Sequence, residues 1–181
     1  MLTLMYILLG LIAIGILCIW YANTYNKFQV LMIRINESEA SIDTVLRKRF
    51  DLLNKSIGII ETNIKTEDPV LEIIVKLRSR KLSNFELDRS LYDAINEFNR
   101  YKEKHKELQK NETFIKIEIG LNESEAEIVA LRKYYNDIIT DYNSLTRTFP
   151  ANIVGKISNF KTRTYFDGKD MTDEVVNDFK L

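Results

Sequence analysis

Apolar residues fill the start of the chain almost without interruption, and the first charged side chain is Lys27. A helix from Leu2 to Ala22 would be roughly 31 Å long, which is enough to cross the hydrocarbon core of a bilayer. Aromatic rings favour the membrane–water interface, so Trp20 and Tyr21 mark the end of the span. The pattern predicts a transmembrane anchor over residues 1–23. Its marker residues are Leu2, Tyr6, Cys18, Trp20, Tyr21 and Ala22.

Two other interpretations of this run fit the sequence less well. A signal peptide needs a basic start, an apolar core of about 7–15 residues and a small-residue cleavage site. Here no Lys or Arg precedes Lys27, and the bulky Trp20 and Tyr21 precede Ala22. A buried core helix would need cover on all sides, which so small a chain can hardly provide. Because Lys27 and Arg34 follow the anchor, the positive-inside rule predicts a cytoplasmic domain and a short external amino terminus.

Beyond the anchor, apolar residues recur at spacings of three and four from Phe28 to Ile64. This period is that of one face of a helix, so the anchor helix is predicted to continue as one long rod. Asp68 and Pro69 supply an N-cap and a first-turn proline for a short second helix that ends near Lys81.

Two further helices are predicted after this point. Ser83 and Glu86 have the spacing of a capping box and start a helix that reaches Tyr101. Asn111 can cap a fourth, long helix that ends near Arg147. We interpret the charged stretch between these two helices as a fraying end or a connection.

The fourth helix is predicted to end at Phe149-Pro150, because proline cannot continue a helix. No stretch shows the alternation of a strand. The fold class is therefore predicted to be all-α, an N-terminal transmembrane helix that continues into an antiparallel helical bundle with long helices. We expect a transmembrane anchor at 1–23, a cytoplasmic helical bundle at 24–150, and a C-terminal segment with an acidic tail at 151–181.

Composition excludes several classes of function. The 26 basic and 26 acidic residues balance, so overall charge does not suggest nucleic-acid binding. Cys18, the single cysteine, lies in the anchor, and the single histidine, His105, is interpreted as a solvated helix residue. A His/Cys zinc site therefore cannot form. Paired carboxylates such as Glu123, Glu125 and Glu127 are expected on solvated faces. We expect no catalytic residue, no metal and no cofactor.

Two polar patterns stand out. The basic cluster Arg47–Arg49 is expected to pair with acidic residues of neighbouring helices. The pair Tyr135-Asn136 recurs seven residues later as Tyr142-Asn143. Seven residues are nearly two helical turns, so the tyrosines share one face and the asparagines the adjacent one. Either a polar-edged seam of the bundle or a recognition surface for a partner explains this repeat.

These stretches, in this order, resemble the LemA family of bacterial single-pass membrane proteins over roughly residues 24–166. The matching segments are 42–52 (IDTVLRKRFDL), 111–114 (NETF), 132–137 (RKYYND) through 142–143 (YN), 149–152 (FPAN), Phe160 and 165–166 (YF). The resemblance implies a membrane-anchored antiparallel helical bundle with a small external amino terminus and a cytoplasmic domain. It does not imply an activity, and no catalytic residue carries over from it. The residues singled out as interaction or structural positions are Asp43, Arg49, Tyr135, Asn136, Tyr142, Asn143, Phe149 and Pro150.

The chain departs from the family pattern at two places. Asn54 stands where the family usually has a proline, which removes an expected kink from the first helix. His105-Lys106 stands where the family has a Tyr-Pro pair. Without this proline, the sequence gives less reason to expect a clean break before the last helix.

The sequence thus favours a non-enzymatic interaction or scaffold protein at the bacterial plasma membrane. Its expected partners are the lipid bilayer and a membrane or envelope protein, and apolar stripes that pair between chains would give self-association. The alternative is a ligand- or metal-binding bundle, with or without enzymatic activity, that uses helix carboxylates and tyrosines.

Overall fold

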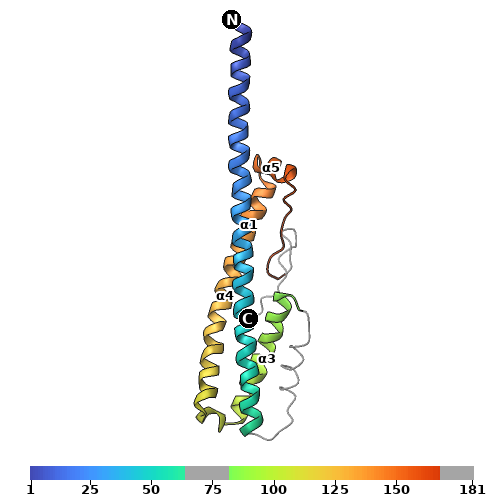
Figure 1. Ribbon diagram of the computed structural model, residues 1–181. Coiled ribbons are helices and arrows are strands. Elements are labelled where there is room, and N and C mark those ends of the chain that lie inside the picture. The colour runs from blue at the N-terminus through green and yellow to red at the C-terminus, as the bar shows by residue number, and fades with distance from the viewer. Residues whose placement is uncertain (64–81, 168–181) are drawn as a thin grey trace. The chain divides into compact units, whose positions relative to one another are not determined.

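The computed structural model describes residues 1–63 and 82–167. The predicted second helix after Pro69 and the acidic tail beyond Asp167 lie outside the described residues. All regular elements in the described ranges are helices, which confirms the all-α prediction (Figure 1). These elements are α1 (Leu2–Asn63), α3 (Asn84–Lys104), the short 3-10 helix η1 (Leu108–Lys110), α4 (Glu112–Arg147) and α5 (Ala151–Ile157).

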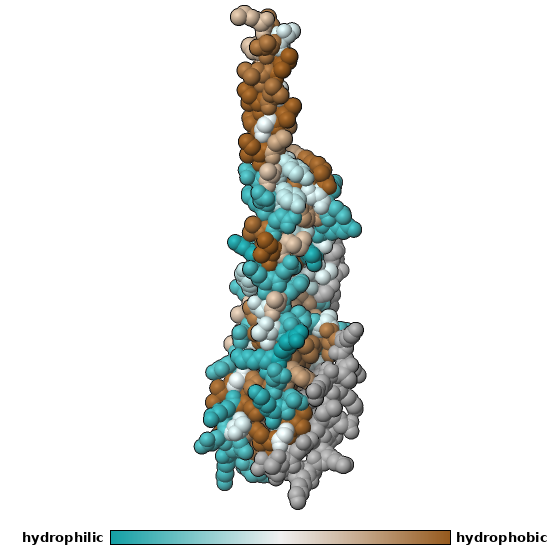
Figure 2. Space-filling view, in the orientation of Figure 1, coloured by the Kyte–Doolittle hydropathy of each residue, from teal (hydrophilic) through white to brown (hydrophobic). Residues whose placement is uncertain are grey.

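Helix α1 is continuous from the apolar run to Asn63, as its pattern predicts, and Asn54 lies within it. The apolar stripe beyond the run is buried, with Phe28, Ile35, Ile42, Leu46, Leu53 and Ile60 at 0 or 1% exposure. Among the described residues, α1 is the helix that is long and apolar enough to cross a membrane. None of its apolar window is covered by protein, and Figure 2 shows this part as hydrophobic surface.

The described residues form two structural units, and both α1 and α4 contribute to each. We call residues 1–37 and 135–165 the anchor unit. The three-helix unit consists of the described residues in 38–134 together with Phe166 and Asp167.

In the three-helix unit, α3 begins as its capping box predicts. The Ser83 hydroxyl accepts a hydrogen bond from the Glu86 amide at 3.3 Å, and the Glu86 carboxylate accepts one from the Ser83 amide at 3.0 Å. The hydrogen bonds that the Ser83 amide and hydroxyl donate to this carboxylate lower the pKa of Glu86. Helices α3 and α4 are antiparallel: the rings of Phe98 and Phe114 stack at 4.9 Å, and the Lys102 ammonium lies 2.5 Å from the Glu118 carboxylate.

A clean break separates α3 from α4, although the chain lacks the proline that the resemblance implies there. His105 is the C-cap of α3, and the turn continues into η1. Asn111 caps α4 as predicted, because its side-chain oxygen accepts hydrogen bonds from the amides of Thr113 and Phe114 at 3.0 and 3.1 Å. The interpretation of His105 as a solvated helix residue is wrong: its half-buried ring lies 4.4 Å from the Tyr101 ring.

In the anchor unit, the sequence pattern missed α5. Helix α4 ends at Arg147, just before Phe149-Pro150 as predicted, and α5 follows directly. The chain then reverses at Asn159, whose φ of 57° is tolerated by asparagine. Gly155 is buried beside α1, and a Cβ atom at this position would lie 3.4 Å from the Phe28 ring, at the edge of ordinary van der Waals contact.

Candidate functional site

Four charged side chains from three helices meet inside the three-helix unit. Arg49 comes from α1, Asp88 from α3, and Glu125 and Arg132 from α4. The Nη2 atom of Arg49 donates to the Glu125 carboxylate, and its Nη1 atom lies 3.8 Å from Oδ1 of Asp88. The Nη2 atom of Arg132 lies 2.6 Å from the Asp88 carboxylate. We call these four residues the ion cluster, and its two guanidinium groups balance its two carboxylates.

The centre of the ion cluster is buried. Arg49 is 0% exposed and Asp88 5%, whereas the Glu125 side chain is 42% exposed. Burial raises the pKa of Asp88, while the neighbouring Arg132 and Arg49 act in the opposite direction. Among the described residues, Nε and Nη1 of Arg49 have no hydrogen-bond partner. A buried ion is costly unless it is paired, so these four groups depend on one another.

Phe166 packs over the edge of the ion cluster. The guanidinium carbon of Arg132 lies 5.8 Å from the centre of the Phe166 ring, a distance typical of a cation–π contact. Phe85 meets the same ring edge-on at 5.9 Å. Both carboxylates of the ion cluster are bound by guanidinium groups, which favours a structural role over proton transfer.

The predicted pairing of the basic cluster is confirmed for two of its three residues. Arg49 pairs with α3 and α4, and Lys48 pairs with Glu127 of α4 at 3.5 Å. For Arg47 the prediction is wrong, because its Nε atom donates to Asp43 of the same helix at 2.8 Å. Arg47 points away from the core, with a side chain that is 75% exposed.

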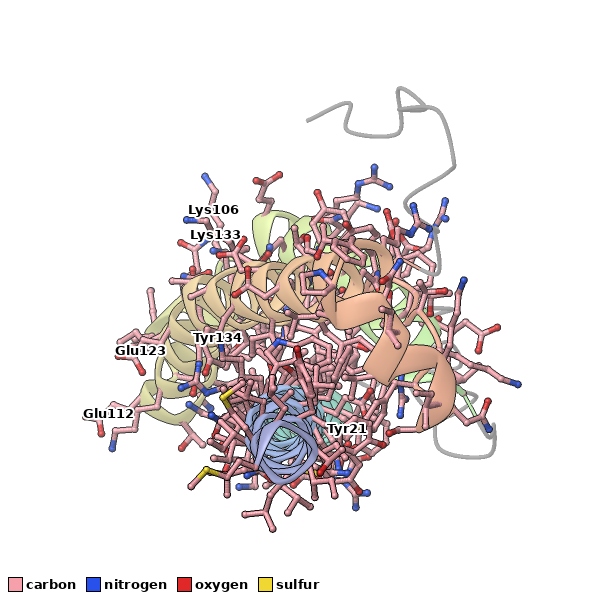
Figure 3. The ribbon with its side chains drawn as sticks, turned by 90° about the horizontal axis from the view of Figure 1, so that it is seen from above. Tyr21, Lys106, Glu112, Glu123, Lys133 and Tyr134 are labelled. Atoms are coloured by element: carbon pink, nitrogen blue, oxygen red, sulfur yellow. The ribbon has the colours of Figure 1, made fainter. Side chains whose placement is uncertain are left out.

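Sequence reasoning missed Asp88, Glu125 and Arg132 as partners of Arg49. The spacing of apolar residues along each helix does carry a signal for the buried pair of Arg49 and Asp88. Arg49 falls three residues after Leu46 and four before Leu53, and Asp88 falls three before Leu91, so both occupy buried positions of their helices. Of the three carboxylates expected on a solvated face, Glu125 belongs to the ion cluster, whereas Glu123 points outward from α4 (Figure 3).

The tyrosine and asparagine repeat lies in the anchor unit, mostly inside it. Tyr135 and Tyr142 are 8% and 1% exposed, and the Tyr142 ring meets Phe28 edge-on at 5.8 Å. Asn143 is fully buried. Its side-chain oxygen accepts from the Arg163 amide at 2.8 Å, and its side-chain nitrogen donates to the Arg163 carbonyl at 2.7 Å. The geometry favours the bundle-seam interpretation, with the returning segment after α5 as the partner of Asn143.

A chain of aromatic rings joins α1 to the segment around the end of α5. Tyr25 and Phe28 of α1 both contact the Phe160 ring, at 5.5 and 4.6 Å. One turn earlier, the Tyr21 hydroxyl lies 2.8 Å from the hydroxyl of Ser158, the C-cap of α5. Figure 3 shows Tyr21 on the side of α1 that faces α5. The predicted end of the anchor and the end of α5 are therefore bonded to each other.

The predicted residues do not converge on one site. Asp43 and Arg49 belong to the three-helix unit, and the others belong to the anchor unit. Phe149 and Pro150 are exposed in the turn before α5, and Asn136 is half-buried. Within the described residues, no group of three or more His, Cys, Asp or Glu side chains is arranged to hold a metal ion.

Comparison with known proteins confirms the resemblance drawn from the motifs. The model of the LemA family matches residues 38–179, which is most of the chain. No curated protein matches the sequence significantly.

Proposed function

Because the chain belongs to the LemA family, we propose that it is a single-pass protein of the bacterial plasma membrane that presents a non-catalytic helical interaction module to the cytoplasm. The observation that carries the proposal is the bare apolar part of α1. Leu4 is 74% exposed and Ile19 64%, and no described segment covers the window between them. Each Leu or Ile removed from water contributes about 1.5–3 kcal/mol, so a bilayer is the favoured surrounding for this segment.

The buried ion cluster supports the non-catalytic part of the proposal. Its carboxylates already hold guanidinium groups, and they join three helices rather than line an open site. A bundle held together in this way offers fixed outer surfaces to a partner. Exposed apolar residues on α4 suit a protein partner, notably Val129 and Tyr134, which are 52% and 49% exposed.

Topology is tested by adding protease to intact cells and, separately, to inverted membrane vesicles. We expect the region after the anchor to stay whole in cells and to be cut in inverted vesicles, because Lys27 and Arg34 favour the cytoplasmic side. Digestion in intact cells would reverse the proposed orientation.

The interaction role is tested by cross-linking the full-length protein in cells and identifying what co-purifies. A reproducible membrane-protein partner mapped to α4 or to residues 149–166 would support an adaptor. Cross-links confined to copies of the chain itself would instead identify an assembling scaffold.

A further inference from the structure

Helix α5 is apolar on its outer face as well as on its inner one. Val154 and Gly155 are buried against α1. Ile153 and Ile157, one turn apart on the opposite side, are 43% and 68% exposed, and Phe149 in the preceding turn is 79% exposed. Three large apolar side chains on so short a segment form an exposed hydrophobic patch, which is typical of a surface that binds an apolar partner.

This surface lies beside the predicted end of the anchor. Ser158 directly follows α5 and is hydrogen-bonded to Tyr21, the aromatic residue that closes the apolar run. Tyrosine rings favour the membrane interface, so the bond holds α5 at headgroup level if α1 spans a bilayer. Figure 1 shows α5 alongside α1 at this point, and Figure 2 shows hydrophobic surface there, next to the base of the anchor.

The charge of the surrounding segment suits an anionic membrane surface. Between Tyr142 and Phe166 the sequence contains four cations and no Asp or Glu. All four are exposed, and two of them, Lys156 and Lys161, lie within α5 and just after it. Apolar side chains flanked by lysines are the pattern of helices that lie in the interface and bind anionic lipids.

We propose that Phe149, Ile153 and Ile157 insert into the headgroup region of the leaflet from which the anchor emerges, with Lys156 and Lys161 against lipid phosphates. The inference rests on the proposed membrane anchoring and is independent of the scaffold role. A helix of this length binds lipid weakly alone, but its attachment to the anchor gives it a high effective concentration at the surface. The second contact fixes how the anchor unit is oriented on the membrane.

The test places an environment-sensitive fluorophore on single cysteines of the full-length protein, in a Cys18→Ser background. The proteins Ile157→Cys, Leu9→Cys and Ile119→Cys are reconstituted into vesicles that contain phosphatidylglycerol, with and without brominated lipid. Ile119 is the matched control, because it is also an isoleucine on a helix and is 51% exposed. We expect bromine quenching of the labels at positions 9 and 157, and a water-like, unquenched label at 119.

Each other outcome is decisive. Quenching at position 9 without quenching at 157 would overturn the inference and leave the anchor intact. A label at 157 that is shielded from water but not quenched would show that protein, not lipid, covers this face. Loss of quenching at position 9 would instead remove the anchor proposal itself. The lipid-phosphate part predicts weaker quenching at 157 in Lys156→Gln/Lys161→Gln, and equal quenching would overturn that part.

Discussion

Replacing Arg49 by methionine tests whether the ion cluster holds the three-helix unit together. Arg49 is the largest fully buried side chain of the described chain. Methionine keeps most of its apolar volume and removes its charge. The variant therefore isolates the loss of the guanidinium from the loss of packing.

The expected cost follows from what the substitution leaves behind. Asp88 would remain buried at 5% exposure, with Arg132 as its remaining ion-pair partner, whereas the half-exposed Glu125 can turn to water. Breaking a buried ion pair from one side costs about 3–5 kcal/mol. Because Arg132 still compensates Asp88, we expect a loss near the lower end, about 3 kcal/mol.

The chain offers a matched control two residues away. Arg47 is on the same helix and also bonded to a carboxylate, but its side chain is 75% exposed. For such a surface pair we expect Arg47→Met to cost about 0.3–0.5 kcal/mol. The double variant Arg49→Met/Asp88→Asn should lose less than the sum of its single changes, because it leaves no buried carboxylate uncompensated.

Urea unfolding of the full-length protein in detergent micelles, followed by far-UV circular dichroism, gives these differences in free energy. Hydrogen exchange in α3 and in the start of α4 locates them in the three-helix unit. If Arg49→Met is no more destabilising than Arg47→Met, the ion cluster does not stabilise the fold and the reasoning is refuted.

Three further predictions follow from buried groups. Tyr135→Ala and Tyr142→Ala should each destabilise the protein by about 2–4 kcal/mol, and unchanged thermal melts would favour the recognition-surface interpretation instead. Asn143→Ala should cost about 1–3 kcal/mol, because the backbone groups of Arg163 lose both partners; faster proteolysis after α5 would reveal the released segment, and an unaltered cleavage rate would contradict this. Since burial raises the pKa of Asp88 above its ordinary 3.8, the folded state binds a proton that the unfolded state has released. The wild type should therefore gain stability relative to Asp88→Asn as the pH falls from the raised folded-state pKa of Asp88 towards 3.8. A difference in unfolding free energy between the two proteins that does not change with pH would argue against the raised pKa.

Much of the fold could be predicted because its signals are local. The apolar stripe of α1, the capping box at Ser83 and the cap at Asn111 act within one or two turns, and all appear in the structure. Helix α5 was missed because seven residues are too few for a helical period to emerge. Its glycine, Gly155, is locally a helix breaker, yet it lies within α5 and packs beside Phe28, which is far away in the sequence.

The candidate site shows the same limit at the level of single side chains. Arg47, Lys48 and Arg49 are consecutive, and stripe spacing alone distinguishes the buried Arg49 from its neighbours. The choice of Glu125 rather than Glu123 as its partner has no local signal, because both belong to one acidic stretch of α4.

The sequence by itself determined the long helices, their caps and the apolar run that fits a membrane anchor, because each depends on neighbours along one helix. The order of its motifs along the chain also identified the family. The tertiary structure alone decided which charges meet in the ion cluster and that α5 is bonded to the base of the apolar run. Those contacts join residues far apart in the chain, such as Arg49 with Glu125 and Tyr21 with Ser158. The physical reason is that such partners are selected by the register and packing of the helices. These arise only when the apolar faces of several helices are buried together, so no single segment encodes the selection.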